Sequence, residues 1–476
     1  MIDRVPSGIQ GLDEVVEGGF PKGSLILLAG NLGTGKTSFS SKFLVSGAES
    51  GEPGVYVLFT EDKDFFISNV SRHLDCNLKG LIDKGKVSIL DLTSLRGEGV
   101  SANIDTIVSE IENLDAKRLV IDSFTAMAQA LKEPVDVRII VHNILSRLTR
   151  GMGCTTIMIE EVPLGESKIG LGLEEFLADG VIMLGTGELD GRLLRYLSIS
   201  KLRGTRLLEQ QLPFTLEGGF RILPPLEPKI AKASQRYRPT PDSPNRFSTG
   251  SRDLDEMLGG GFPKGSNILF EATERFTTSE YTRIILPIAL NFLTQGRGIM
   301  LVPTVGMDAD FCVGILSSFG IAEKEINRLL RFCELPTPGR NQAKPHIAVF
   351  EGNDIQKDYE RWLRLESELM QNTGQPVLTL SGLDTLANIF GPEVCSGLLS
   401  QDIARIRSRG TIGILIAKPG YEELVRKLSI MAEIHLKLAK EHDSILLYGM
   451  KPRTNLYAVE MEISSGYPMP RLTPII

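Results

Sequence analysis

A glycine-rich pattern occurs twice in this chain, and its repetition constrains the fold more than any other feature of the sequence. Residues 8–24 read GIQGLDEVVEGGFPKGS, and residues 250–266 read GSRDLDEMLGGGFPKGS. Both ends of the pattern are separated by the same 242 positions (250 − 8 and 266 − 24). Because so dense a match at one constant offset is not expected by chance, the chain is predicted to contain two copies of one structural module.

The ends of the two modules resemble each other as well, and a proline-rich segment separates them. Residues 197–205 read LSISKLRGT, and residues 447–454 read LYGMKPRT. We therefore predict one domain over residues 1–230 and a second over 245–476. The segment between them, 231–244, is predicted to be an extended, semi-rigid linker.

Short aliphatic and β-branched runs alternate with helical stretches in the first module. The apolar runs lie at 25–29, 54–59, 87–90, 118–121 and 155–159, and apolar residues recur at helical spacing in 36–48, 103–113 and 135–150. Because the short runs are continuously apolar, they predict strands that are buried on both faces of a sheet. The predicted fold class is α/β, with a mainly parallel sheet flanked by helices in each module.

The composition is typical of a soluble globular protein and excludes several classes of function. Apolar residues make up 42% of the 476 positions and charged residues 23%, and the net charge is −7. That charge argues against a nucleic-acid binder that relies on overall charge. Neither a membrane span nor a secretory signal is expected. Five scattered cysteines predict no disulfide framework and no zinc pair, so we expect a reduced, cytoplasmic protein.

Residues 30–37, GNLGTGKT, match the pattern of a phosphate-binding P-loop. Its glycines allow the main chain to turn tightly and to present several N–H groups to phosphate oxygens, and the following helix directs its positive end at the same anion. Lys36 is expected to reach the β- and γ-phosphates of ATP, and the Thr37 hydroxyl to ligate Mg²⁺. The predicted nucleotide-binding residues are Gly30, Asn31, Leu32, Gly33, Thr34, Gly35, Lys36, Thr37 and Ser38.

A carboxylate follows the apolar run at 118–121. Asp122 lies where that predicted strand ends, at the sheet edge where open α/β proteins bind their ligands. This is the position of a Walker B carboxylate. Asp122 and Thr37 are therefore the predicted Mg²⁺ ligands, unless Asp122 only ends a strand.

Two further pairs of residues supply carboxylates at predicted strand ends. Glu61 is our choice for the group that activates the attacking water; the alternatives are Asp62 as the base, or a cluster that is only a solvated strand end. Glu160 and Glu161 follow the run at 155–159. One of these two senses the state of the γ-phosphate, or both belong to an ordinary solvated turn.

Two more motifs follow the P-loop in the first module. Residues 174–181 read EEFLADGV, and residues 200–205 read SKLRGT. Together with the glycine-rich pattern and the P-loop, they make most of residues 1–225 resemble the KaiC family of RecA-like ATPases. The second module resembles this family more weakly. The resemblance implies two tandem RecA-like domains, with ATP and Mg²⁺ as cofactors.

The resemblance also implies an oligomer, often a hexameric ring, with ATP bound between neighbouring subunits. In such rings the segment that contains Lys201 and Arg203 meets the nucleotide of the next subunit. These two cations are therefore predicted to act catalytically in trans on γ-phosphate charge, the alternative being two exposed cations on a hairpin. KaiC proteins carry two adjacent glutamates where this chain has Thr60 and Glu61. We therefore expect slow hydrolysis.

The second module lacks the residues of the phosphate site. At the offset of 242 positions, Thr278 stands in place of Lys36 and Arg275 in place of Gly33. The lysine that would face the phosphates is missing, and β-carbons fill the tight turn that glycine permits.

Negative charge and the loss of a metal ligand strengthen this prediction. Glu271 and Glu274 are expected to lie where a polyanion would bind, and Ser381 replaces Asp122 at the end of the corresponding strand. We predict no Mg–ATP hydrolysis in 245–476, and no autophosphorylation there.

These features lead to a KaiC-like ATP-binding protein that hydrolyses ATP slowly in its first domain. Nucleotide state would control oligomer assembly or binding of a protein partner in signalling. One alternative is a DNA-acting ATPase of the RecA and RadA type, although the loop at 163–172 offers no aromatic residue for base stacking. The other is a nucleotide-gated binding protein with negligible turnover. Whether the retained Lys451 and Arg453 contact a nucleotide stays open.

Overall fold

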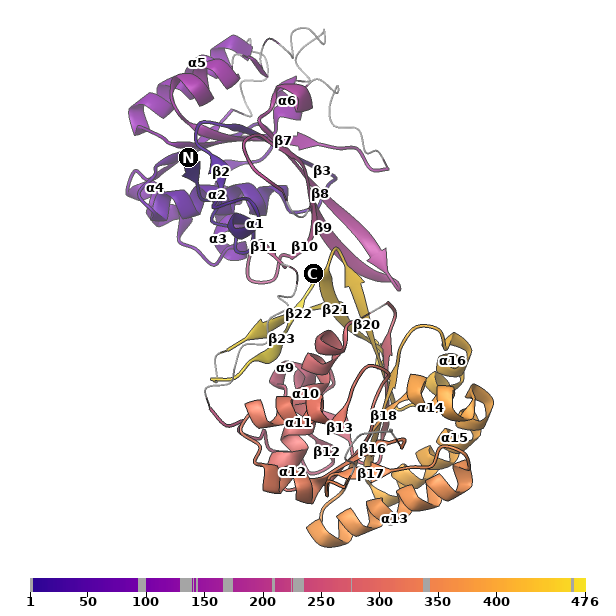
Figure 1. The fold of residues 1–476 in the computed structure, drawn as a ribbon. Helices are drawn as coiled ribbons and strands as arrows, with labels where there is room; N and C mark the ends of the chain where they lie inside the picture. The colour runs from indigo at the N-terminus through magenta and orange to yellow at the C-terminus, as the bar shows by residue number, and fades with distance from the viewer. Residues whose placement is uncertain are drawn as a thin grey trace. The chain divides into compact units, whose positions relative to one another are not determined.

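The computed structural model describes residues 3–92, 100–128, 139, 141–142, 144–165, 174–207, 210–223, 225, 235–274, 276–336, 343–463 and 466–476. The chain divides into two compact units (Figure 1). The N-terminal unit comprises Met1–Pro224 and Pro474–Ile476, and the C-terminal unit comprises Pro225–Thr473. Within the described residues, no helix is long and apolar enough to cross a membrane.

The N-terminal unit is built on a nine-stranded sheet in the order β11-β10-β9-β8-β3-β7-β6-β4-β5. The strands from β8 to β5 are parallel, and β9, β10 and β11 extend the sheet antiparallel to their neighbours. The strands are β3 (Leu25–Gly30), β4 (Gly54–Leu58), β5 (Val87–Asp91), β6 (Arg118–Asp122), β7 (Thr155–Glu161), β8 (Gly180–Leu189), β9 (Arg192–Leu202), β10 (Gln211–Thr215) and β11 (Arg221–Ile222). A separate ribbon pairs β1 (Arg4–Val5) with β2 (Phe20–Pro21).

Helices cover both faces of this sheet, and the central strand β3 is buried along its whole length. One hydrophobic cluster includes Phe39 and Phe43, and a second, on the other face, includes Ile107 and Ile111. The helices are α1 (Leu12–Val15), α2 (Lys36–Glu49), α3 (Lys63–His73), α4 (Leu78–Asp83), α5 (Val100–Leu114), α6 (Phe124–Ala128), the π-helix η2 (Ile144–Gly151) and α8 (Glu174–Leu177).

The C-terminal unit repeats this plan with a ten-stranded sheet in the order β17-β16-β15-β18-β19-β14-β20-β21-β22-β23. The strands from β17 to β20 are parallel, and β21 and β22 continue antiparallel. The strands are β14 (Asn267–Ala272), β15 (Ile299–Val302), β16 (Leu330–Glu334), β17 (Ile347–Val349), β18 (Leu378–Gly382), β19 (Ile412–Ala417), β20 (Ile434–Glu441), β21 (Ser444–Lys451), β22 (Tyr457–Glu462) and β23 (Met469–Pro474). A ribbon again pairs β12 (Arg246–Phe247) with β13 (Phe262–Pro263).

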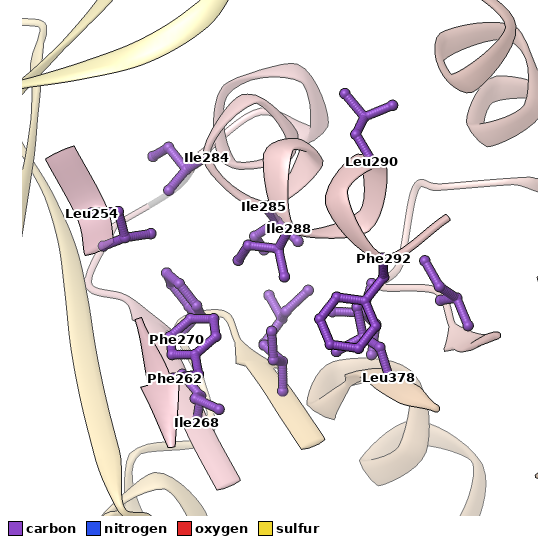
Figure 2. Close-up of a cluster of buried hydrophobic side chains, with 14 of the residues drawn as sticks. Leu254, Phe262, Ile268, Phe270, Ile284, Ile285, Ile288, Leu290, Phe292 and Leu378 are labelled. Atoms are coloured by element: carbon purple, nitrogen blue, oxygen red, sulfur yellow. The ribbon is translucent and has the colours of Figure 1, made fainter. Parts of the chain in front are cut away.

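Helices α9 to α12 lie on one side of this sheet and α13 to α16 on the other (Figure 1). They are α9 (Arg252–Met257), α10 (Thr278–Thr294), α11 (Ala309–Ser318), α12 (Glu323–Leu329), α13 (Ile355–Thr373), α14 (Leu383–Phe390), α15 (Pro392–Arg409) and α16 (Glu422–Met431). Figure 2 shows the core beneath α10, where Ile284, Ile285 and Ile288 face Phe270 and Ile268 of β14. Burying each such side chain contributes roughly 1.5–3 kcal/mol, so this layer fixes α10 against the sheet.

The two sheets confirm the predicted α/β class with two mainly parallel sheets flanked by helices. The central strand of each sheet, β3 or β14, is followed by a helix at the same 242-residue offset, from Lys36 to Thr278. Residues 235–244, which the sequence places in the linker, belong to the C-terminal unit. In that segment Tyr237 is buried, and Asp242 forms an ion pair with Arg297 at 2.5 Å.

Candidate functional site

The P-loop lies at the carboxyl edge of the parallel strands, between β3 and α2. A Cβ atom at Gly30 would lie 2.6 Å from the carbonyl oxygen of Leu184, so only glycine fits there. Gly35, the residue before α2, has a φ of 98°, and no side chain caps the first turn of the helix. The N–H groups of that turn are therefore available to an anion.

Hydrogen bonds within and behind the P-loop fix its shape. Thr34 Oγ1 donates to the Asn31 carbonyl at 2.8 Å. The Asn31 amide donates to the carbonyl oxygens of Val162 and Pro163, at 3.1 and 2.9 Å. Leu32 lies at the exposed tip. The loop is thus held to the segment that follows β7.

The Lys36 ammonium group folds back over the P-loop. Its Nζ donates to the carbonyl oxygens of Gly30 at 2.9 Å and of Asn31 at 2.8 Å. Burial lowers the pKa of Lys36, while the charges of Glu161 and Asp122 raise it. A cation held by two carbonyl groups can exchange them for phosphate oxygens, which bind it more strongly.

Asp122, at the end of β6, lies beside the first turn of α2, which holds Thr37 and Ser38. Thr37 Oγ1 is 3.4 Å from Asp122 Oδ2. Burial raises the pKa of Asp122, whereas a hydrogen bond from Tyr56 and the charge of Lys36 lower it. Two oxygens so placed suit Mg²⁺, which keeps several water ligands. The described residues contain no cluster of three or more His, Cys, Asp or Glu side chains that could hold a metal ion by themselves.

Tyr56 is a residue of the site that the sequence analysis missed. It is fully buried on β4, and its hydroxyl donates to Asp122 Oδ2 at 2.7 Å. Ser40 Oγ on α2 lies 3.0 Å from the same hydroxyl. Tyr56 therefore holds one oxygen of the carboxylate in place. The only sign of this role in the sequence is that Tyr56 places a hydroxyl group within an otherwise apolar strand.

Glu61 lies in the turn after β4, because that strand ends at Leu58 rather than continuing to the acidic pair. Burial raises the pKa of Glu61, and the charge of Asp122 raises it further, whereas a hydrogen bond from Asn69 lowers it. Because Glu61 follows the carboxyl end of β4, where Leu58 pairs in parallel with Asp122, it lies at the same edge of the sheet as the P-loop.

Asp62 has a structural task at the start of α3. Its Oδ1 atom accepts hydrogen bonds from the main-chain N–H groups of Asp64 and Phe65, both at 3.0 Å. A helix cap of this kind is worth about 1 kcal/mol. The arrangement favours Glu61 over Asp62 as the group that activates water.

Glu160 and Glu161 differ in exposure at the end of β7. Glu160 is 3% exposed, whereas Glu161 is exposed and its charge acts on both Lys36 and Asp122. The Glu161 N–H donates to Thr125 Oγ1 at 2.8 Å. Glu161 is therefore the member of the pair that faces the P-loop, and the γ-phosphate-sensing role stays a prediction.

The structure does not bring Lys201 together with the P-loop of its own unit. Lys201 pairs with Val181, and Val181 pairs with Leu27, three residues before Gly30 on β3. Three residues of a strand span about 10 Å. Lys201 thus lies toward the amino edge of the parallel strands, and the phosphate loop lies at the carboxyl edge.

Both cations are bound at that amino edge. Lys201 Nζ donates to the Ala178 carbonyl at 2.7 Å, and the exposed Arg203 forms an ion pair with Asp179 at 3.2 Å. In the C-terminal unit, Lys451 Nζ likewise donates to the Ala432 carbonyl, at 2.6 Å.

Arg195 is the arginine that approaches the P-loop within the N-terminal unit. It lies on β9 opposite Thr186, and its Nη1 donates to the Gly33 carbonyl at 3.2 Å. Burial lowers the pKa of Arg195. The sequence analysis missed this residue, because nothing in the motifs relates β9 to a loop 162 positions away.

The corresponding helix of the C-terminal unit is capped by the chain itself. The main-chain N–H of Thr277 donates to Glu280 Oε2 at 2.7 Å, and the Glu280 N–H donates to Thr277 Oγ1 at 3.3 Å. Lys440 Nζ contacts the other oxygen of Glu280 at 2.8 Å. Burial raises the pKa of Glu280, but these hydrogen bonds and the charge of Lys440 bring it below the ordinary value. An ionised carboxylate thus occupies the helix end.

Ser381 occupies the place predicted for it, whereas Glu271 does not. Ser381 pairs with Val302 just as Asp122 pairs with Leu58, so it holds the register position of the Walker B carboxylate. Glu271 is not an unpaired charge in the loop: it lies on β14, and its carboxylate is 2.7 Å from Nε2 of His435. Arg275 and residues 166–172 of the loop at 163–172 lie outside the described residues.

The chain is similar to known proteins over about half of its length. A family model described as ATPase: KaiC matches residues 5–227. The circadian clock oscillator protein KaiC of Thermostichus vulcanus is 36% identical over 277 residues, which are 56% of this chain and 52% of that protein. The chain therefore spans about half the length of the curated clock proteins that it matches.

Smaller relatives are matched over their whole length. A UPF0273 protein of Pyrococcus furiosus is 32% identical over 256 residues, which are 50% of this chain and 99% of that protein. The crystal structure of a KaiC-like protein from Pyrococcus horikoshii is 37% identical, with a TM-score of 0.43. It is covered completely (100%) by 47% of this chain.

Proposed function

The chain belongs to the KaiC family of ATPases, and from this premise we propose that its N-terminal unit binds Mg²⁺–ATP and hydrolyses it slowly. The observation that carries the proposal is the pairing of an uncapped P-loop helix with Thr37 and Asp122 at one sheet edge. Nucleotide state would then control assembly of the chain or binding of a partner protein.

Each residue of the site has a task in this proposal. The N–H groups of residues 33–38 and the Lys36 ammonium group bind the phosphates, and Thr37 and Asp122 hold Mg²⁺. The metal supplies neutralisation of phosphate charge when bound. Glu61 orients the attacking water and accepts its proton.

Replacing Tyr56 with phenylalanine is expected to raise the Mg²⁺ concentration for half-maximal turnover about tenfold. The substitution removes a hydrogen bond to a charged carboxylate, which is worth about 1.5–3 kcal/mol. The measurement is a Mg²⁺ titration of ATP turnover at saturating ATP. Tyr281→Phe, at a buried tyrosine of the C-terminal unit, is the control. An unchanged titration for Tyr56→Phe contradicts a positioning role.

Lys201 and Arg203 are proposed to act on the nucleotide of a neighbouring subunit, in a ring that has ATP at its interfaces. Their location supports this proposal, since both lie toward the edge of the sheet away from their own P-loop. Exposed arginine on one subunit and phosphate on the next form a charge-assisted pair that strengthens as the transition state develops.

Mixing two inactive variants tests this geometry. Lys36→Ala removes the cation of its own site, and Arg203→Ala removes the cation offered to the neighbour. Reassembled in equal amounts, they are expected to regain about one quarter of wild-type turnover, because one interface in four combines both intact residues. Lys36→Ala mixed with Asp122→Asn is the control and regains nothing, since both changes affect the same subunit's site. If the first mixture also stays inactive, Arg203 does not act in trans.

Hydrolysis is proposed for the N-terminal unit alone. The carboxylate of Glu280 at the α10 terminus and the hydroxyl of Ser381 support this restriction. A triphosphate would have to displace an internal anion that two hydrogen bonds and Lys440 stabilise. For the same reason we expect no autophosphorylation in this unit.

A further inference from the structure

The C-terminal unit contains a cavity of about 350 Å³ at the carboxyl ends of β15, β16 and β18. Helices α13, α14 and α15 form its other walls, through Trp362, Leu386 and Leu399 among others. Val302 and Cys333 form its floor. The cavity thus lies at the sheet edge where open α/β proteins bind ligands, but over different strands from the capped helix α10.

The cavity is partly open to solvent and would hold several water molecules if no ligand filled it. Interiors are packed to the density of organic crystals, and a water molecule accounts for only about 30 Å³. The cavity separates two hydrophobic clusters of the same unit, one containing Phe350 and Trp362 and the other containing Leu383 and Leu399. Side chains that could meet across the sheet end are instead held apart, which favours a ligand that fills the gap.

The serine that replaces the Walker B carboxylate in the C-terminal unit is also part of the cavity. Ser381, at the Walker B register position, is one of the residues that line the cavity. A hydroxyl group there needs no metal ion and leaves more room than a carboxylate.

The charges around the cavity restrict what it can bind. Glu334, Asp358 and Asp402 line it, and no lysine or arginine is among its described lining residues. Asp358 accepts hydrogen bonds from the N–H groups of Glu351 and Gly352, at 3.0 and 2.7 Å. Asp402 is paired with Arg405 at 2.6 Å and accepts a hydrogen bond from the Tyr359 hydroxyl at 3.1 Å. Because no cation among the described residues lines the cavity to pair with an anionic ligand, the lining favours a neutral one.

Aromatic side chains form part of the apolar wall, beside a larger number of aliphatic ones. Phe350, Tyr359, Trp362 and Phe390 all line the cavity. Rings pair with other rings in offset or edge-to-face contacts, which add stability beyond the area that they bury. A cavity of a few hundred Å³ lined in this way is the size of small-molecule pockets.

We propose that the C-terminal unit binds a neutral, aromatic small molecule in this cavity. The unit that is not expected to hydrolyse ATP is then the sensory half of the chain. The proposal is independent of ATP hydrolysis, and its test does not require turnover.

Two dyes with the same ring systems test both the cavity and its charge. N-phenyl-1-naphthylamine is neutral and carries one N–H donor, and 8-anilino-1-naphthalenesulfonate adds a negative sulfonate. Titrated with the full chain, the neutral dye is expected to show saturable fluorescence enhancement at one site per chain. The sulfonate is expected to bind at least about tenfold more weakly, because the described lining supplies no cation for its charge and Glu334 adds a carboxylate.

Variants assign the signal to the cavity. Leu386→Trp fills the space from α14 and is expected to abolish binding of the neutral dye, whereas Ile430→Trp, at an exposed position of α16, leaves it unchanged. Glu334→Gln is expected to strengthen sulfonate binding and leave the neutral dye unaffected, which provides a second readout if Leu386→Trp does not fold. Equal affinity for the two dyes, or no response to any of these substitutions, overturns the proposal.

Discussion

Replacing Lys36 with alanine is expected to lower ATP turnover at least about 100-fold, the loss typical of removing one donor to developing charge. The ammonium group is held over the P-loop by the carbonyl oxygens of Gly30 and Asn31, at 2.9 and 2.8 Å. Turnover at saturating Mg²⁺–ATP is the measurement, with equilibrium binding of a non-hydrolysable ATP analogue beside it.

Lys440→Ala is the matched control, because Lys440 is the cation at the corresponding helix end of the C-terminal unit. It contacts Glu280 rather than an open loop, so its loss is expected to leave turnover unchanged. If Lys440→Ala lowers turnover as much as Lys36→Ala does, hydrolysis is not restricted to the N-terminal unit.

The fold could be predicted because the repeat and the strand pattern are local properties of the sequence. Continuously apolar runs such as Leu25–Ala29 have only one stable place, between two layers of helices, and the structure buries β3 completely. Because the repeat has a constant offset, the same architecture could be predicted for the C-terminal unit, where β14 and α10 occupy the expected places.

The parts of the site that could not be predicted are contacts between distant strands. Tyr56 and Asp122 are 66 positions apart and meet only because β4 and β6 are neighbours in register. Arg195 reaches Gly33 from the antiparallel end of the sheet. Side-chain direction across a sheet is set by strand order, and strand order is not encoded in any single motif.

The residue that occupies the helix end in the C-terminal unit could not be predicted from the sequence either. Acidic residues could be seen in place of the P-loop, but Glu271 is paired with His435 in the sheet, and the helix end is occupied by Glu280. Glu280 is the first residue after the segment that aligns with the motif, at the position of Ser38. The capping box becomes visible only when Thr277 is known to begin the helix.

Replacing Glu61 with glutamine is expected to lower turnover about 100-fold or more while nucleotide binding is retained. A glutamine keeps the shape of the side chain but cannot accept a proton from the attacking water, and general-base catalysis contributes about 10²–10⁴-fold. Asp62→Asn is the matched control. Its amide oxygen can still accept the N–H groups of α3, so it is expected to keep most of the turnover.

The pH dependence of turnover provides an independent test of Glu61. Burial and the charge of Asp122 raise its pKa, so the base becomes protonated at a higher pH than an ordinary glutamate. Wild-type turnover is therefore expected to fall as pH decreases through that raised pKa, whereas the residual turnover of Glu61→Gln lacks this acidic limb. If the wild type and Glu61→Gln have equal, near-background rates, the chain is a nucleotide-gated binding protein. A fast Glu61→Gln variant instead assigns the base to another carboxylate, and Glu161 is the first to examine because its charge acts on the same loop.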